Sequence, residues 1–429
     1  MRAAGLLTLT LGLLALGTLP ESITSLLFFT LAILLALAPP AVIFSGFTTG
    51  AFWLVFGGMI LGEAVKTSGL ADRLAALFLR GRSLDYPGFI GRIVILGTAL
   101  CFVMPSTPAR VLLLVPLITA MTGQLNLRPG GRGHVGACVA GILSTYQAGA
   151  AVLSANVPNL VLAGGAETVY GLPIRYLDYL VIQFPVMGLL KLLSVWLVTV
   201  VLFKERVQLD TEGAQPRPLT GVEKRLAIIL FLALVLWATD TLHGINPGWI
   251  SLAAATICLL PPSRISPPSV LTQGMNFGAL LYLAAALGLG TMVTHTGLDK
   301  LLSSPLTSLL ALQPGHPFEN FLALTTMATF TGMVTTNPAQ PALLVPLASQ
   351  FAATAEWPLF PVLMSFAVGF STVIFPYQVP PIVIGLQVAG ISTRRSLRLI
   401  LPLAAIGLLV LLPLNYLWWQ VLRLLSGTP

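Results

Sequence analysis

Long apolar runs recur from one end of this chain to the other, and they limit its fold more than any other feature. The 429 residues are 56% apolar and only 8% charged, whereas a soluble protein carries about 25% charged residues. Runs of this length predict helices that cross a lipid bilayer, so we expect an all-α polytopic membrane protein. The ten predicted spans cover residues 4–20, 22–40, 48–69, 134–165, 178–203, 225–242, 247–261, 277–297, 357–390 and 397–424.

Two further apolar regions, residues 87–123 and 317–350, differ from simple spans. Each has proline, threonine and small residues at its centre, and each is long enough to enter the membrane, turn and leave on the same side. Charges of both signs flank the second region, which fits a hairpin that enters from outside. Because basic residues favour cytoplasmic loops, the arginines around the first region predict a re-entrant hairpin with both ends in the cytoplasm; they are Arg73, Arg80, Arg82, Arg92, Arg128 and Arg132.

The longest polar part of the chain, residues 204–224, separates two halves, residues 1–203 and 225–429. Its lysines and arginines predict a cytoplasmic linker in a multi-pass protein of the cell (inner) membrane. The formal net charge of +8 reflects such basic loops. No basic run mixes with aromatic residues, so we expect no nucleic-acid partner.

The two halves share a sequence phrase. The pattern P-A-x-x-x-L-L-V-P-L starts at Pro108 and again at Pro338. Two weaker pairs follow the same order: SGL at 68–70 with TGL at 296–298, and VPNLVLA at 157–163 with VPPIVIG at 379–385. Three collinear matches predict a duplication. Because each half then holds an odd number of spans and one hairpin, the second half is expected to be inverted relative to the first.

Four proline-containing stretches interrupt the apolar runs. Two are the hairpin tips, at 106–108 and 336–338, and two are breaks inside the predicted helices 134–165 and 357–390, at 154–159 and 375–381. Proline prevents the helix from continuing, and unpaired backbone groups are tolerated at membrane depth only where they line a cavity or are buried in protein. Freed carbonyls can bind a cation, and freed N–H groups at helix N-termini can bind an anion.

Kinks that only shape packing would explain a single break, but four breaks at corresponding places favour a binding site for a small anionic solute. We expect these residues to contact it: Ser106, Thr107, Arg110, Asn156, Val157, Pro158, Thr336, Asn337, Gln340, Gln378, Val379 and Pro380.

At these stretches the sequence resembles the divalent anion/sodium symporter family of the ion transporter superfamily. That family has a Ser-Asn-Thr phrase at each hairpin tip and a proline nine residues after its Asn; here Thr107 precedes Pro116, and Asn337 precedes Pro346, by the same spacing. The family's Thr-Pro-Pro-Asn-like helix break resembles residues 156–159 and, more weakly, 378–381. The resemblance covers most of the chain from about residue 48.

The resemblance implies a homodimeric elevator-type secondary transporter and no enzyme. It implies dicarboxylates, citrate or sulfate as substrates, with sodium as the usual coupling ion and no other cofactor. On this basis the candidate sodium ligands are Ser106, Thr107, Ala155, Asn159, Thr336 and Asn337.

The chain departs from the family pattern where sodium would bind. Both tips lose the final Thr of the phrase, and Arg110 and Gln340 stand where family members carry a further hydroxyl. Three interpretations of Arg110 stay open: it pairs with the anionic substrate, its fixed charge replaces a sodium ion, or it reaches water or an acid such as Glu63.

Two rival functions are weighed against anion transport. A cation/proton antiporter of the same superfamily needs an intramembrane carboxylate, and Glu63 is the only acid deep in a predicted span. An intramembrane protease is disfavoured because no His-Glu-x-x-His motif occurs and no paired aspartates lie in facing spans. Within anion transport, sulfate or another inorganic anion remains the alternative to a dicarboxylate.

Overall fold

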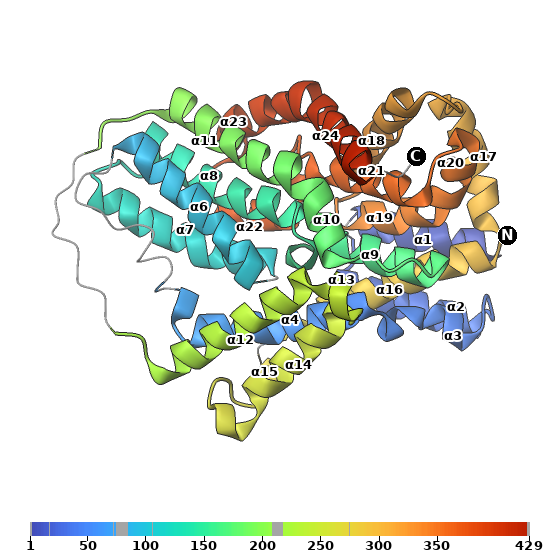
Figure 1. Ribbon diagram of the computed structural model, residues 1–429, viewed down its shortest axis with the longest axis horizontal. Coiled ribbons are helices and arrows are strands. Elements are labelled where there is room, and N and C mark those ends of the chain that lie inside the picture. The colour runs from blue at the N-terminus through green and yellow to red at the C-terminus, as the bar shows by residue number, and fades with distance from the viewer. Residues whose placement is uncertain are drawn as a thin grey trace.

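The computed structural model describes residues 2–16, 18–71, 73, 85–104, 106–207, 218–273 and 275–426, and every element within these ranges is helical (Figure 1). Some positions used in the topology prediction, Arg80, Arg82 and Arg217, lie outside them, as does most of the predicted linker.

The first half begins with a helix pair and ends with one long helix. The elements are α1 (Arg2–Leu16), α2 (Glu21–Leu34), α3 (Pro40–Ile43), α4 (Gly50–Thr67), α6 (Tyr86–Val103), α7 (Thr107–Gln124), α8 (Arg132–Ala150), α9 (Val157–Tyr170), α10 (Tyr176–Gln183) and α11 (Lys191–Phe203). A short 3-10 turn, Leu153–Ala155, separates α8 from α9. A π-helical segment, Phe184–Leu190, joins α10 to α11.

The second half ends, like the first, with a broken helix followed by one long helix. Its elements are α12 (Gly221–Ala238), α13 (Asp240–His243), α14 (Pro247–Leu259), α15 (Val270–Gln273), α16 (Phe277–His295), α17 (Leu298–Leu310), α18 (Pro317–Val334), α19 (Ala339–Leu344), α20 (Ala348–Ala355), α21 (Leu359–Ser371), α22 (Pro380–Val388), α23 (Thr393–Ile406) and α24 (Leu412–Ser426). A 3-10 turn, Pro376–Gln378, again separates α21 from α22, and a π-helical segment, Gly407–Leu411, joins α23 to α24.

Four helices of the described chain are long and apolar enough to cross a membrane: Tyr86–Val103, Tyr176–Phe203, Phe277–His295 and Thr393–Leu425. The last three fall on predicted spans. The first falls in the region 87–123, which forms two helices of 18 residues each, α6 and α7. The predicted spans 134–165 and 357–390 are helix pairs with a break between them.

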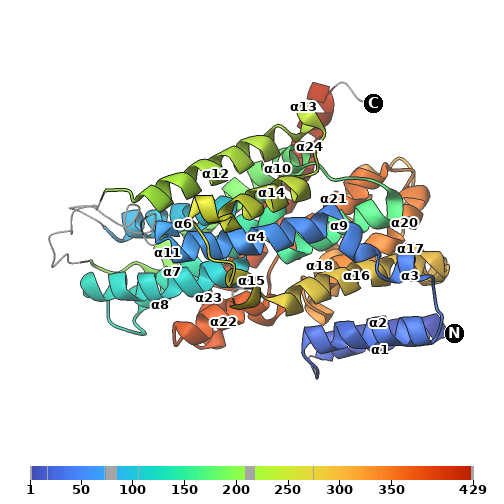
Figure 2. The same cartoon turned by 90° about the horizontal axis from the view of Figure 1, so that it is seen from below.

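The helices form two groups that each draw on both halves of the sequence. In Figure 1 α4, α12 and α14 run along the lower side, whereas α6, α8, α11 and α21 to α24 lie above them. Figure 2 shows α1 and α2 side by side at one edge, and α2 packs on α16. We call α2, α4, α12, α14 and α16 the lower group, and α6 to α11 with α18 to α24 the upper group.

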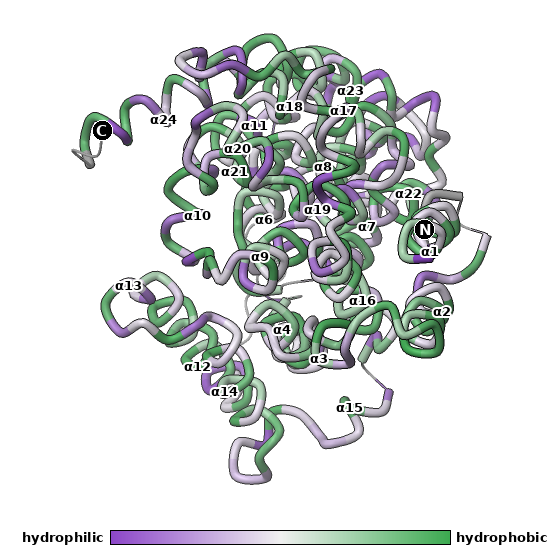
Figure 3. Tube along the Cα trace, turned by 90° about the vertical axis from the view of Figure 1, so that its right-hand side faces the viewer, coloured by the Kyte–Doolittle hydropathy of each residue, from purple (hydrophilic) through white to green (hydrophobic). Residues whose placement is uncertain are grey.

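Apolar residues recur along the helices of both groups (Figure 3). Phe231 in α12 and Leu409 in the π-helical segment are 65% and 76% exposed. A soluble protein rarely exposes contiguous apolar surface of this kind. Outward-facing apolar side chains on long helices are what a lipid environment requires.

Helices α4 and α14, one from each half, cross at close range. A Cβ atom on Gly57 of α4 would lie 2.6 Å from the backbone carbonyl of Ser251 in α14. The Ser251 hydroxyl also donates a hydrogen bond to the carbonyl of Leu54, at 3.2 Å. Small residues let membrane helices approach in this way, so this contact joins the two halves.

We predict that Gly57→Ala lowers the thermal unfolding temperature of the detergent-purified protein, because overpacking costs about 1–3 kcal/mol. Gly62→Ala in the same helix is the matched control, since a Cβ atom there has no neighbour within 4 Å. Equal unfolding temperatures for the two variants would contradict the close crossing.

Candidate functional site

A cavity of about 450 Å³ lies where the four proline-containing stretches meet. Both tips and both breaks contribute to its lining. Of the predicted contact residues, six line it: Ser106, Thr107, Asn156, Val157, Val379 and Pro380, joined by Pro108 and Pro338. Segments more than 200 residues apart in sequence therefore converge on one space, and small-molecule sites have volumes of about 300–1,000 Å³.

Three helices begin at this cavity. Helix α7 starts at Thr107 with its N-cap Ser106, whose hydroxyl accepts a hydrogen bond from the Ala109 N–H at 3.4 Å. Helices α9 and α22 start at Val157 and Pro380. Each has proline in its first turn, where the missing N–H is not needed. The positive ends of three helix dipoles therefore face the cavity and favour an anion.

Asn156 provides an unpaired hydrogen-bond donor. Its side chain is 4% exposed and lines the cavity. The Oδ1 atom accepts a bond from the Thr107 hydroxyl at 3.4 Å, whereas Nδ2 has no partner among the described residues. A buried unpaired donor costs about 1–3 kcal/mol, and an anion in the cavity would remove this cost.

The lower group closes the other side of the cavity. Glu63 and Lys66 of α4 line it, with their charged atoms 3.7 Å apart, as does Glu21 of α2. Tyr282 of α16 lines it too, and Tyr146 of α8 lines it from the upper group. The sequence pointed to Glu63 only as a deep acid and a possible partner of Arg110. It did not point to Glu21 or the two tyrosines, because only the packing of α2, α8 and α16 brings them here.

Arg110 lies behind the first tip, fully buried and outside the cavity lining. Its guanidinium donates to the Met104 carbonyl at the end of α6. It also donates to the hydroxyl of Thr107 at 2.9 Å and to the carbonyls of Thr145 at 3.2 Å and Ala155 at 3.0 Å. No carboxylate of the described chain is within ion-pair distance of it, and the side chain does not reach water.

Space for this guanidinium is provided by Gly149 in the last turn of α8, where a Cβ atom would lie 2.8 Å from Arg110 Nη2. The positive charge therefore sits among backbone carbonyls at the C-terminal ends of α6 and α8, where helix dipoles are negative. Hydroxyl and carbonyl oxygens of Thr107 and Ala155 are two of the predicted sodium ligands. Arg110 therefore already donates hydrogen bonds to these two oxygens.

The second tip is held by Asn337, which is fully buried. Its Nδ2 donates to the Tyr146 hydroxyl at 2.9 Å and the Phe370 carbonyl at 2.6 Å, and its backbone N–H donates to the Gln378 carbonyl at 2.9 Å. The Gln378 side chain accepts from the N–H groups of Ile374 and Phe375, at 2.7 and 2.8 Å. These bonds fix the tip to the break, so Gln378 supports the site from behind and does not line the cavity.

The remaining predicted residues surround the breaks without lining the cavity. Asn159 donates to the carbonyls of Gly149 and Val152, both at 2.8 Å, and its Oδ1 has no partner among the described residues. The Thr336 carbonyl accepts from the Ala339 and Gln340 N–H groups. Gln340 is fully buried with both side-chain polar atoms unpaired in the described structure. Pro158 is buried in the first turn of α9.

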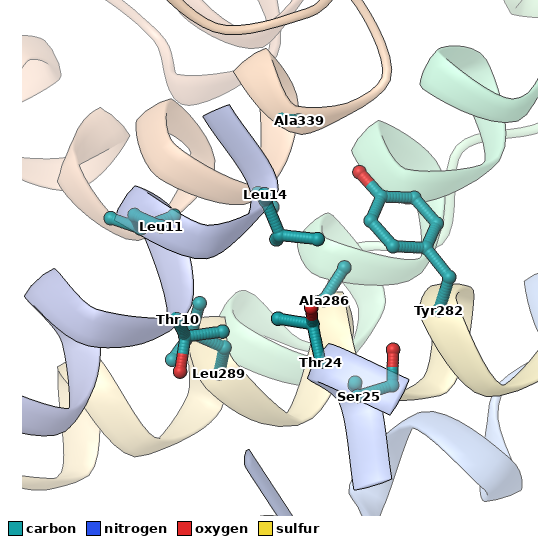
Figure 4. Close-up of a pocket in the computed structure, with 11 residues that line it drawn as sticks. Thr10, Leu11, Leu14, Thr24, Ser25, Tyr282, Ala286, Leu289 and Ala339 are labelled. Atoms are coloured by element: carbon teal, nitrogen blue, oxygen red, sulfur yellow. The ribbon is translucent and has the colours of Figure 1, made fainter. Parts of the chain in front are cut away.

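A second, much smaller space lies nearby between α1, α2, α16 and α19 (Figure 4). Its volume is about 10 Å³, enough for at most about one water molecule. Thr10, Leu14 and Ala286 are among its mostly apolar lining residues. The larger cavity is therefore the candidate site.

Solved structures with a similar fold are membrane transporters. The YdaH transporter of Alcanivorax borkumensis has a TM-score of 0.62 at 17% identity and covers 89% of this chain and 88% of its own. MtrF of Neisseria gonorrhoeae, from a class of antimetabolite efflux pumps, has a TM-score of 0.58 at 12% identity, covering 88% and 82%. At these identities the likeness shows that the chain shares their fold.

Residues 2–425 match the family described as the sodium:sulfate symporter transmembrane region, so the chain belongs to this family, as its resemblance predicted. An L-tartrate/succinate antiporter of Escherichia coli (strain K12) is 24% identical over 411 residues, 89% of this chain and 80% of that protein. A membrane protein of Cupriavidus necator is 22% identical over 395 residues, covering 88% and 76%. The protein is a transporter and not an enzyme.

We predict that Asn337→Ala destabilises the protein by about 1–3 kcal/mol, because it removes both bonds that Nδ2 donates and leaves the Tyr146 hydroxyl oxygen without its buried donor. Asn415→Ala is the matched control: Asn415 is also fully buried, but neither of its side-chain polar atoms has a partner in the described structure. Thermal unfolding in detergent measures both. An equal loss in the two variants would show that the Asn337 bonds contribute nothing.

Proposed function

We propose that this transporter moves small divalent anions, di- or tricarboxylates such as succinate, malate or citrate. They would bind in the cavity between the two tips and the two breaks. The observation that carries the proposal is the convergence of three helix N-termini and the unpaired Asn156 amide on one cavity. Neither the tips nor the breaks contribute an acidic side chain to the lining, whereas Glu21 and Glu63 of the lower group do.

The size of the cavity supports a carboxylate substrate over sulfate. Each water molecule occupies about 30 Å³ in the liquid, so the cavity volume corresponds to roughly fifteen waters. A dicarboxylate can place one charged end near α7 and α9 and the other near α22. The E. coli relative is named for two dicarboxylates, L-tartrate and succinate, and for antiport. Its likeness supports the same substrate class and exchange here.

We further propose that the two halves are inverted repeats and that α6–α7 and α18–α20 are the re-entrant hairpins. Each half has a 3-10 turn between the two parts of a broken helix and a π-helical segment in its last long helix, which supports this proposal. In an elevator mechanism the upper group, which carries both tips and both breaks, would move against the lower group. The cavity between the two groups is consistent with such a motion. The homodimer and the inner-membrane location remain predictions from the resemblance and the charge pattern.

In this proposal Arg110 is a built-in cation: the charge of its guanidinium replaces that of a sodium ion. Its position behind the tip favours replacement of a sodium ion over direct contact with the substrate, and its oxygen partners are of the kind that bind sodium. Transport of the dianion then needs no sodium ion beside the first tip.

The test of the substrate class is a thermal-shift series on detergent-purified protein with succinate, L-tartrate, citrate, sulfate and phosphate, each in sodium and in choline buffer. A ligand at a hundred times its dissociation constant stabilises by about 2.7 kcal/mol if it binds only the folded state. We predict that dicarboxylates give the largest shift and that Asn156→Asp abolishes it, because a carboxylate would then face the anion.

Asn246→Asp is the matched control for this variant. Asn246 caps α14 away from the cavity, with its Oδ1 accepting from the Gly248 N–H at 2.9 Å, and Asp caps helices equally well. This control should keep the shift. A larger shift with sulfate would reassign the substrate, and no shift with any anion would favour a cation/proton antiporter acting through Glu63.

Arg110→Gln tests the built-in cation. We predict that succinate exchange by proteoliposomes in choline buffer falls at least about tenfold, equivalent to 1.4 kcal/mol. Sodium should restore part of the exchange, because it can bind the oxygens of Thr107, Thr145 and Ala155 that the guanidinium no longer contacts. Unchanged exchange in choline would rule out this role for Arg110, and so would a loss that sodium does not restore.

A further inference from the structure

Basic side chains gather at one end of the upper group, on the side that the charge pattern predicts to be cytoplasmic. They come from three segments far apart in sequence: the connection from α7 to α8 with the first residue of α8, the residues directly after α11, and the first two turns of α23. We call this set the basic face, and all of its members are exposed: Arg128, Arg132, Lys204, Arg206, Arg394, Arg395 and Arg398.

Hydrogen bonds hold the three segments together. Arg395 Nη1 donates to the Gly130 carbonyl at 3.1 Å, which joins the start of α23 to the connection between α7 and α8. Arg132 Nη2 donates to the Leu202 carbonyl at 2.7 Å, which joins the start of α8 to the end of α11. The basic side chains of both halves of the sequence therefore lie on one surface.

Little negative charge compensates the basic face. Among the described residues of the three segments only Glu205 is acidic, and its carboxylate accepts a hydrogen bond from the Gly133 N–H at 2.6 Å. Arg128, Arg394 and Arg398 form no hydrogen bond and no ion pair within the part of the chain that the structure describes. Their guanidinium groups can therefore bind an anion that comes from outside the protein.

The same helices expose apolar side chains directly beyond the basic face, in the predicted spans 178–203 and 397–424. Val201 of α11 is 68% exposed and Leu401 of α23 is 45% exposed. Leu401 follows Arg398 by three residues, so the two side chains lie on the same side of α23. A soluble phosphate would contact only the basic groups. A phospholipid would contact them with its phosphate and the apolar side chains with its acyl chains.

We propose that the basic face binds the phosphate groups of anionic phospholipids in the cytoplasmic leaflet. Arginine suits this ligand, because its planar fork of donors can bond two phosphate oxygens at once. Each lysine or arginine near an anionic membrane surface strengthens binding about fivefold. The whole basic face belongs to the upper group, so the bound lipid would hold the group that carries the tips and breaks. The inference does not depend on which solute is transported.

The test is a thermal-unfolding titration of the full-length protein in detergent with phosphatidylglycerol, which is anionic, and with phosphatidylcholine, which has no net charge. Phosphatidylglycerol should reach half of its stabilising effect at a concentration at least about tenfold lower than phosphatidylcholine. Sodium chloride at about 1 M should remove most of this difference, because the Debye length is then only about 3 Å.

Arg394→Gln combined with Arg398→Gln removes two unpaired charges from the basic face. This double variant should need at least about tenfold more phosphatidylglycerol than the wild type for the same effect. Its unfolding temperature without lipid should not change, because neither side chain has a partner in the described structure. Arg394→Lys combined with Arg398→Lys keeps the charge and should stay within about threefold of the wild type.

The matched control is Lys224→Gln combined with Arg225→Gln, which removes two exposed charges from the lower group at the start of α12. It should also stay within about threefold of the wild type. Glycerol phosphate, which has the phosphate without acyl chains, distinguishes a lipid from a free anion.

Three results would overturn the proposal. The first is an equal effect of the two lipids on the wild type. The second is a response to phosphatidylglycerol that the Arg394→Gln and Arg398→Gln protein keeps, or that the lower-group control loses equally. The third is stabilisation by glycerol phosphate that the same double variant loses, because the basic face would then bind a soluble anion.

Discussion

Broken helices leave backbone N–H donors and carbonyl acceptors without partners in the helix. The structure depends on which groups bind each kind. The N–H ends of α7, α9 and α22 face a cavity, where a mobile anion can accept their hydrogen bonds. The carbonyl ends of α6, α8 and α21 face protein, where Arg110 and Lys191 donate to them. Unsatisfied groups of either kind would cost several kcal/mol in hydrocarbon. The tips and breaks therefore separate negative helix ends, which the side chains of Arg110 and Lys191 contact, from positive helix ends that face the cavity.

The supporting polar contacts are arranged so that the two halves of the sequence depend on each other. Tyr146 of α8 binds both Asn337 at the second tip and the Phe370 carbonyl at the second break. Lys191 of α11 reaches the end of α21, and the close crossing of α4 and α14 joins the halves in the lower group. Neither half can complete the cavity alone, because each tip and break is held by residues from the other half or lines a space that both share.

Much of the fold follows from local sequence chemistry. Proline cannot continue a helix, so the breaks at 154–159 and 375–381 and the helix starts at Thr107 and Val157 lie where the prolines place them. The duplicated phrase also marked both tips in advance. The site was harder to predict from the sequence, because packing decides which side chains are buried and which groups they contact. Gln378 was expected to face the cavity and instead supports the second tip. Lys191 carried a readable signal, a charge within the apolar run 178–203, but nothing in the sequence indicates that it reaches Ser371.

The most direct test of this account is an experimental structure, by cryo-electron microscopy, of the protein with bound succinate in sodium-containing buffer. The account predicts density for the dianion between Ser106, Asn156 and Val379. It also predicts guanidinium density, and no sodium ion, among the oxygens of Thr107 and Ala155. A sodium ion at this place, with Arg110 turned away, would contradict the account, and so would succinate bound outside the cavity.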